Sequence, residues 1–94
     1  MTVEELRSKL KRIIADLISS GFGSIDSGTV KELEKSAAIS EGLGMREGKR
    51  LIENLSGAMK AIQEGKSGAE SGNVRLMALD FYIKKLAGRN TEEL

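Results

Sequence analysis

The side chains of this chain that could perform acid–base or covalent chemistry are carboxylates, lysines and a single tyrosine, Tyr82. The sequence contains no Cys and no His. Cys-His zinc sites, thiol catalysis, histidine bases and the Ser-His-Asp arrangement are therefore excluded, and so is a disulfide framework. No spacing in the sequence brings the remaining groups together as a catalytic set. We therefore expect a protein that is not an enzyme and that uses no cofactor and no metal.

Two short patterns resemble functional motifs but are better explained by structure. Gly65-Lys66-Ser67 is similar to part of a phosphate-binding loop, but that motif needs a glycine where Lys60 stands, and it follows a strand. The neighbouring carboxylates of the sequence lie at expected helix starts or near the end of the chain, where acidic residues favour the helix dipole or are solvated. These carboxylate pairs are Glu4 with Glu5, Glu32 with Glu34, and Glu92 with Glu93.

Of the basic groups in the sequence, the one formed by Arg46, Lys49 and Arg50 is the stronger candidate for nucleic-acid binding. The segment around 34–52 resembles a helix-turn-helix, in which a helix after the turn enters the major groove of DNA. Gly48 stands where that motif favours a large apolar residue, and the helix after the turn is expected to be about twice the usual length. The net charge of the whole chain is only +1. Nucleic-acid binding is therefore an alternative to the main interpretation, with these three residues as its contacts.

Hydrophobic periodicity predicts four helices and no strand. The first begins with a capping box formed by Thr2 and Glu5 and ends before Gly21. The second is expected over 30–41 behind a second capping box, in which Thr29 is the cap, and the third over 45–64. The fourth is expected over 73–87 with Gly88 as its end, after a flexible loop over 65–72. Residues 89–94 are expected to be a frayed tail.

Glycine positions inside the third helix suggest close packing. Gly48 and Gly57 lie within an otherwise continuous helical pattern, although each glycine costs about 1 kcal/mol relative to alanine in an exposed helix interior. Their retention predicts that a neighbouring element approaches the helix closely at these points. Two further apolar residues, Phe22 and Ile25, are expected to fold onto the bundle from the loop after the first helix.

The fourth helix carries more apolar circumference than one packed face requires. One arc contains Val74, Met77, Ala78 and Phe81, and a second arc contains Leu76, Leu79, Ile83 and Leu86, with Tyr82 between them. Either this helix is central and packs on two sides, or one arc meets another chain. We favour the second arc as the exposed one, because Arg75 falls within it. The predicted interface is Leu76, Leu79, Tyr82 and Leu86.

A family resemblance supports the helical interpretation. The run from Glu34 to Met45, with its Gly42-Leu43-Gly44 ending, and the following Leu51-Ile52-Glu53-Asn54-Leu55 resemble small helical bacterial regions associated with SWIM-type zinc-finger proteins. The zinc ligands of those proteins are absent here, since the chain has no Cys or His. The resemblance implies a helical companion domain and assigns no functional residue.

Together these patterns predict one all-α domain over 1–88, a small four-helix bundle whose leading topology is an antiparallel up-and-down path. No apolar run is long enough to span a membrane, and the absence of Cys fits a cytoplasmic protein. The expected function is a non-catalytic protein–protein interaction or scaffold module that self-associates as a homodimer. The predicted core consists of Leu6, Leu10, Ile13, Leu17, Leu33, Leu51, Leu55, Ile62, Met77, Phe81 and Ile83.

Overall fold

The chain is seen here as a computed structural model that describes the backbone of residues 2–22 and 27–92 and the side chains of these ranges up to Leu86. The described residues form four helices and no strand: α1 over Val3–Ser20, α2 over Ser27–Gly42, α3 over Arg46–Gln63 and α4 over Ala69–Glu92. The predicted all-α bundle is therefore confirmed.

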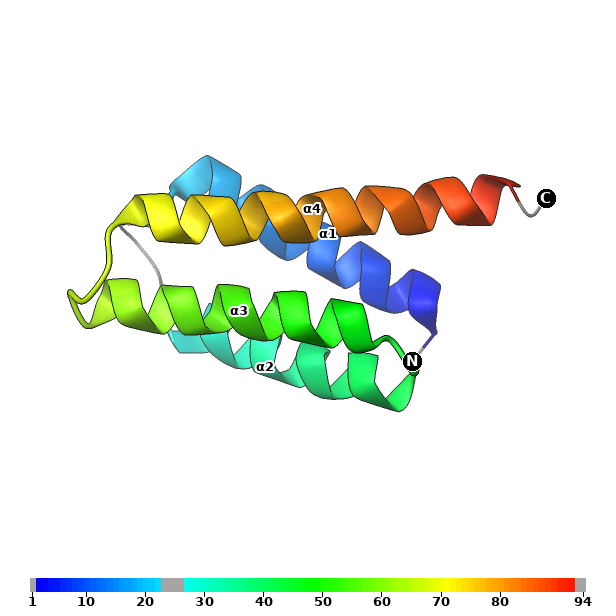
Figure 1. The fold of residues 1–94 in the computed structure, drawn as a ribbon, viewed down its shortest axis with the longest axis horizontal. Helices are drawn as coiled ribbons and strands as arrows, with labels where there is room; N and C mark the ends of the chain where they lie inside the picture. Colours follow the sequence, from blue (N-terminus) through cyan, green and yellow to red (C-terminus); the bar gives the residue numbers. More distant parts are fainter. Residues whose placement is uncertain (1, 23–26, 93–94) are drawn as a thin grey trace.

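The four helices lie around one core. The most extensive contacts join α2 to α3 and α3 to α4, and α1 closes the bundle by packing on both α2 and α4. In Figure 1, α4 lies over α3, and successive helices along the chain run in opposite directions. Leu6, Leu10, Leu33, Ile52, Leu55 and Leu79 are among the fully buried side chains that fill the space between them.

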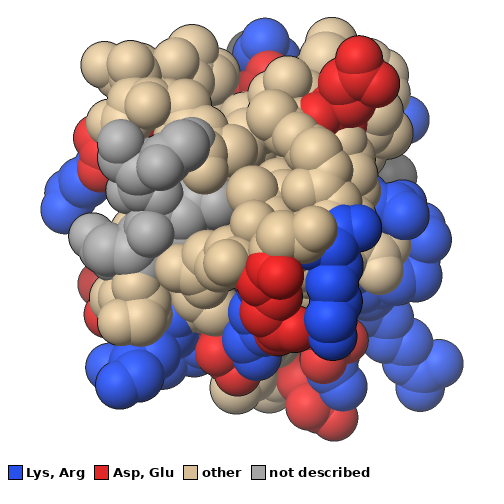
Figure 2. All heavy atoms as spheres, turned by 90° about the vertical axis from the view of Figure 1, so that its left-hand side faces the viewer, with Lys and Arg blue, Asp and Glu red and all other residues tan. Residues whose placement is uncertain are grey.

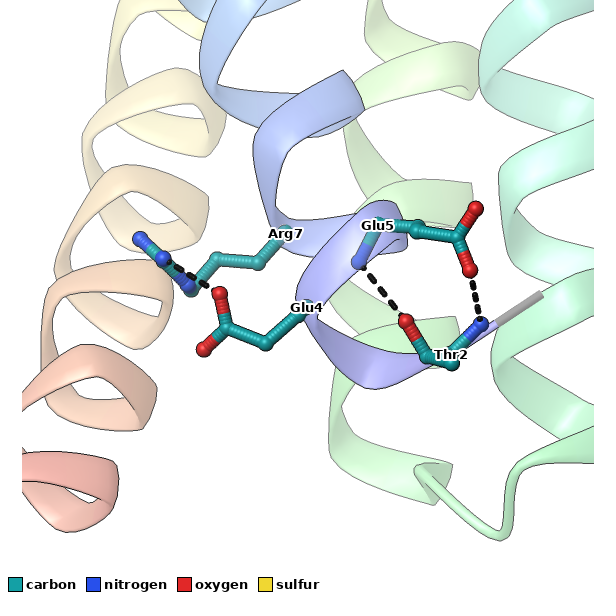
Figure 3. A network of polar contacts seen from close by, with 4 residues as sticks. All are labelled: Thr2, Glu4, Glu5 and Arg7. Carbon is teal, nitrogen blue, oxygen red and sulfur yellow. Dashed lines mark hydrogen bonds and ion pairs between the residues drawn. The ribbon is translucent and has the colours of Figure 1, made fainter.

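The start of α1 is held by the predicted capping box. The backbone N–H of Glu5 donates to the Thr2 hydroxyl over 3.1 Å, and the backbone N–H of Thr2 donates to the Glu5 carboxylate over 3.0 Å. Figure 3 shows this reciprocal pair beside the ion pair of Arg7 and Glu4, which are 2.8 Å apart. Two backbone donors that the first turn of a helix leaves unpaired are satisfied in this way.

The end of α1 also follows the sequence prediction. Gly21 takes a positive φ of 73°, which a residue with a Cβ rarely adopts, and its N–H donates to the carbonyl of Leu17. The chain then turns so that Phe22 enters the core, where its side chain is buried. The predicted burial of Ile25 falls outside the described residues.

The second helix begins earlier than predicted. Because α2 starts at Ser27, Thr29 lies inside its first turn and is not the cap. The helix contributes Val30 and Leu33 to the core, and the rest of its buried face is formed by small residues, Ser36, Ala37 and Ser40. Such small side chains allow α3 to approach closely, and they explain why the apolar stripe of this segment is thin in the sequence.

The fourth helix extends beyond its predicted limits at both ends. It starts at Ala69, within the predicted loop, and continues through Gly88, its predicted end, to Glu92. The early start of the helix is explained by packing at Gly72, which is buried. A Cβ on Gly72 would lie 2.9 Å from the Phe22 ring and 2.9 Å from Cδ1 of Ile62, so this turn of α4 packs directly on the core.

The core agrees with the prediction in part. Leu6, Leu10, Leu17, Leu33, Leu55 and Ile83 are buried as predicted, and Ile13, Leu51 and Ile62 are partly buried against the same cluster. Met77 and Phe81 are exposed, contrary to prediction. Their predicted places are taken by Leu76 and Leu79, and further buried residues are Ile14, Phe22, Val30, Ala37, Ile52, Ala58 and Met59.

Charged residues surround this core unevenly. In Figure 2, which views the end of the bundle where α3 passes into α4, Lys and Arg gather toward the lower half and the right margin. Uncharged residues cover most of the described part of the upper half, where α1 and α4 lie. None of the helices in the described ranges combines the length and the apolar character that crossing a membrane demands.

Candidate interaction site

The outer face of α4 exposes three large apolar side chains. Val74 is 64% exposed, Met77 71% and Phe81 61%, and Ala78 between them is exposed as well. The spacing of these residues places them on one side of the helix, opposite the side that packs on the core. We call the four residues Val74, Met77, Ala78 and Phe81 the α4 stripe.

The α4 stripe is the opposite arc from the predicted interface. Leu79 is fully buried and Leu76 almost so, while Leu86 of the same arc and Tyr82 at its border are half-buried. Leu76 and Leu79 therefore belong to the core of the chain and cannot form an outer surface. The prediction was wrong because it relied on Arg75, whose long side chain reaches solvent from the margin of the inward arc.

The rotation of α4 about its axis follows from the small residue on its inward arc, which allows close packing against the neighbouring helices. Gly72 lies on the same side as Leu76, Leu79 and Ile83, and its missing Cβ lets Phe22 and Ile62 come close to the helix backbone. Only this side can come so close to the bundle at the start of α4. The branched residues of the inward arc then fill the core, and the α4 stripe faces outward.

Charged residues bound the α4 stripe at its two ends. Glu70 lies one turn before Val74, and Lys85 lies one turn after Phe81. The Nζ atom of Lys85 lies 4.8 Å from the centre of the Phe81 ring, within the range of a cation–π interaction. Lys84, on the border of the stripe, pairs with Asp80 of the same helix over 2.9 Å.

Beside the stripe, the first turns of α3 and the second half of α4 form an open groove of about 820 Å³. Its apolar lining includes Met45, Leu51, Phe81, Tyr82 and Leu86. Gly48 borders the same region, since a Cβ added to it would lie 3.1 Å from Cε2 of Tyr82. Gly48 therefore marks a close contact between α3 and α4, as predicted. Gly57 does not, because nothing lies within 4 Å of the Cβ position there.

The predicted nucleic-acid contacts are largely engaged with acidic residues. Lys49 pairs with Glu41 over 3.2 Å, and Arg50 pairs with Glu47 over 2.6 Å. Glu53 lies close to the same group, around a shallow depression that also includes Arg46. Carboxylates interleaved with the cations repel phosphate, so this surface is poorly suited to bind a nucleic-acid backbone.

The helices on either side of this group do not form a helix-turn-helix. In that motif the two helices cross at a large angle, whereas α2 and α3 lie side by side along their length. Ion pairs join them both near the turn, between Glu41 and Lys49, and far from it, between Glu34 and Lys60 over 3.4 Å. The segment around 34–52 is therefore part of a hairpin of two helices, and this part of the prediction was wrong.

The described residues form no candidate metal site. They contain no group of three or more carboxylates that could hold a metal ion. The pKa of Glu5 is lowered by the backbone N–H and the hydroxyl of Thr2, and the pKa of Glu32 is lowered by Lys9, whose Nζ lies 2.8 Å away. Both are surface carboxylates with structural partners. Lys66 of the loop that resembles a phosphate-binding motif pairs with Glu64 over 2.9 Å.

Comparison with family models, with curated proteins and with solved structures gave no match for this chain.

Proposed function

We propose that this chain is a non-catalytic helical module for protein–protein interaction, and that it self-associates through the α4 stripe. The observation that carries the proposal is the exposure of Val74, Met77 and Phe81, each more than 60% open to solvent, on one side of one helix. Scattered exposed apolar residues are ordinary in soluble proteins, whereas a contiguous apolar stripe bounded by charges is typical of an interface.

A second copy of the chain is the simplest partner for this surface. Symmetric homodimers are the commonest oligomers, because one patch that complements itself serves both subunits. A single stripe on one helix provides a small interface, and interfaces of this kind are weak or transient. We therefore expect a dimer that dissociates reversibly in the micromolar to millimolar range. The module would act in the cytosol, where a chain without cysteine is unaffected by the reducing environment.

Substitution within the stripe tests the proposal. Met77→Glu places a charge at the most exposed apolar position of α4 and should leave a folded chain that stays monomeric. Lys31→Glu, at an exposed position of α2, also lowers the net charge and serves as the control. Size-exclusion chromatography with light scattering reads the mass of both variants and of the wild type. Equal dimerisation of Met77→Glu and wild type would show that the stripe is not the interface.

The nucleic-acid alternative is less well supported. The net charge of the chain is +1, and of the three candidate contacts Lys49 and Arg50 are already paired with carboxylates. Weak, non-specific affinity is the most that such a surface would provide.

A further inference from the structure

We infer that two copies of the chain pair through α4 in an antiparallel orientation, with Glu70 of each copy against Lys85 of the other. This inference rests on the proposed self-association and goes further, because it fixes the direction and register of the contact. Two features of the stripe carry it: the spacing of its residues and the order of its charges.

The spacing of the stripe reads the same from either end of the helix. Glu70, Val74, Met77, Ala78, Phe81 and Lys85 follow one another at steps of four, three, one, three and four residues. The midpoint of this series lies between Met77 and Ala78. A two-fold axis through that midpoint would place Val74 against Phe81 of the second copy and Met77 against its Ala78, so that each large side chain at the centre meets a small one.

The charges of the stripe have opposite signs at its two ends. Glu70 precedes the apolar residues and Lys85 follows them. Antiparallel pairing brings each glutamate to the lysine of the other copy, whereas parallel pairing in register brings glutamate to glutamate and lysine to lysine. Antiparallel helices also place their dipoles in the favourable opposite sense. Both electrostatic contributions therefore select the same orientation.

Both residues are available for such a contact. Glu70 and Lys85 are exposed, and neither forms an ion pair with another residue in the described ranges. Lys84 differs from Lys85 in this respect, because Asp80 already neutralises it within the helix. Lys85 lies over the ring of Phe81, so its charge is held at the end of the apolar surface that the second copy would cover.

Charge reversal at the two positions tests the inference. Glu70→Lys gives a stripe that is positive at both ends, and Lys85→Glu gives one that is negative at both ends. In an antiparallel dimer each variant alone meets like charges twice, and its self-association should weaken by about tenfold at low salt. An equimolar mixture of the two variants restores both attractive contacts and should associate as tightly as the wild type.

Sedimentation equilibrium measures the association of each variant and of the mixture, and circular dichroism confirms that every chain is folded. Glu53→Lys and Lys31→Glu, which make the same charge changes at exposed positions of α3 and α2, should associate like the wild type. Single variants as tight as the wild type, or a mixture as weak as either, would overturn the antiparallel register while leaving self-association intact. A wild-type chain that stays monomeric would instead refute the proposed function itself.

Discussion

Glycines at three helical positions differ sharply in what surrounds them. A methyl group on Gly72 would lie 2.9 Å from the Phe22 ring, and one on Gly48 would lie 3.1 Å from the ring of Tyr82. On Gly57 it would meet nothing within 4 Å. Within one small bundle, glycine therefore stands at a buried contact (Gly72), at a tight contact between two helices (Gly48) and on an open surface (Gly57).

Alanine substitution should separate these three cases. Gly57→Ala should stabilise the fold by up to about 1 kcal/mol, because alanine restricts the unfolded chain and favours the helix. Gly72→Ala should destabilise it, since the new methyl group overlaps a buried ring and cannot be accommodated without displacing it. Gly48→Ala should fall between the two. Thermal unfolding of the three variants gives the order, and equal stabilisation by Gly57→Ala and Gly72→Ala would contradict the packing described for α4.

The lowered pKa of Glu32 makes part of the stability depend on pH. Its carboxylate accepts a hydrogen bond from Lys9 of α1, so the charged form is favoured in the folded state. A carboxyl whose folded pKa lies below its unfolded pKa stabilises the fold at neutral pH, and this contribution is lost as the pH falls through the folded pKa.

We expect the difference in stability between wild type and Glu32→Gln to be present near neutral pH and to disappear in acid. Denaturant unfolding at a series of pH values measures it, with Glu53→Gln as a control at an exposed position of α3. A difference that persisted unchanged below the pH range of carboxyl titration would show that Glu32 contributes by packing instead of by charge.

At the scale of the element, the decisive feature is the rotation of α4 about its own axis. Two residues that lie two positions apart show this rotation directly, because Leu79 is fully buried and Phe81 is 61% exposed. Leu79→Asp buries an unpaired carboxylate and should cost about 3 kcal/mol or more, whereas Phe81→Asp should leave the helical content and the melting temperature close to those of the wild type. Circular dichroism melts distinguish the two, and a Leu79→Asp variant that melts at the wild-type temperature would contradict the orientation of α4.

The same helix shows where the sequence is informative and where it is not. The hydrophobic periodicity that predicts α1 and α3 is unambiguous, because each of these helices has one apolar face. The capping residues Thr2 and Gly21 also identify the two ends of α1. In α4 both arcs are apolar, so periodicity identifies the helix but not the arc that faces inward. The choice depends on the contact of Gly72 with Phe22 and Ile62, which lie far from it in sequence. Such a contact leaves no local signal other than an apparently misplaced glycine.

The helix-turn-helix interpretation failed for a related reason. The turn over 43–45 and the basic start of α3 have the residue types of that motif, but the angle between the helices is set by the small buried residues of α2. Ser36, Ala37 and Ser40 allow α3 to lie along α2 over its length. Local composition therefore identified the turn correctly and could not specify the packing on either side of it.

For the molecule as a whole, the balance of charge predicts weak contact with nucleic acid. With a net charge of +1 and carboxylates beside the basic residues, binding to random duplex at physiological salt should be no tighter than about 10⁻⁴ M. Fluorescence anisotropy with a labelled duplex measures this. Micromolar, salt-sensitive binding that is lost on combining Arg46→Ala with Arg50→Ala would favour the nucleic-acid alternative instead.

The central claim is that the four helices enclose one core but leave the α4 stripe exposed, and that a second copy of the chain covers this stripe. Sedimentation equilibrium of the wild-type chain from micromolar to millimolar concentration tests this claim most directly. We expect a reversible equilibrium between monomer and dimer, with the apparent mass rising toward twice that of the chain as concentration increases. A mass that stays at the monomer value even at millimolar concentration would contradict the claim.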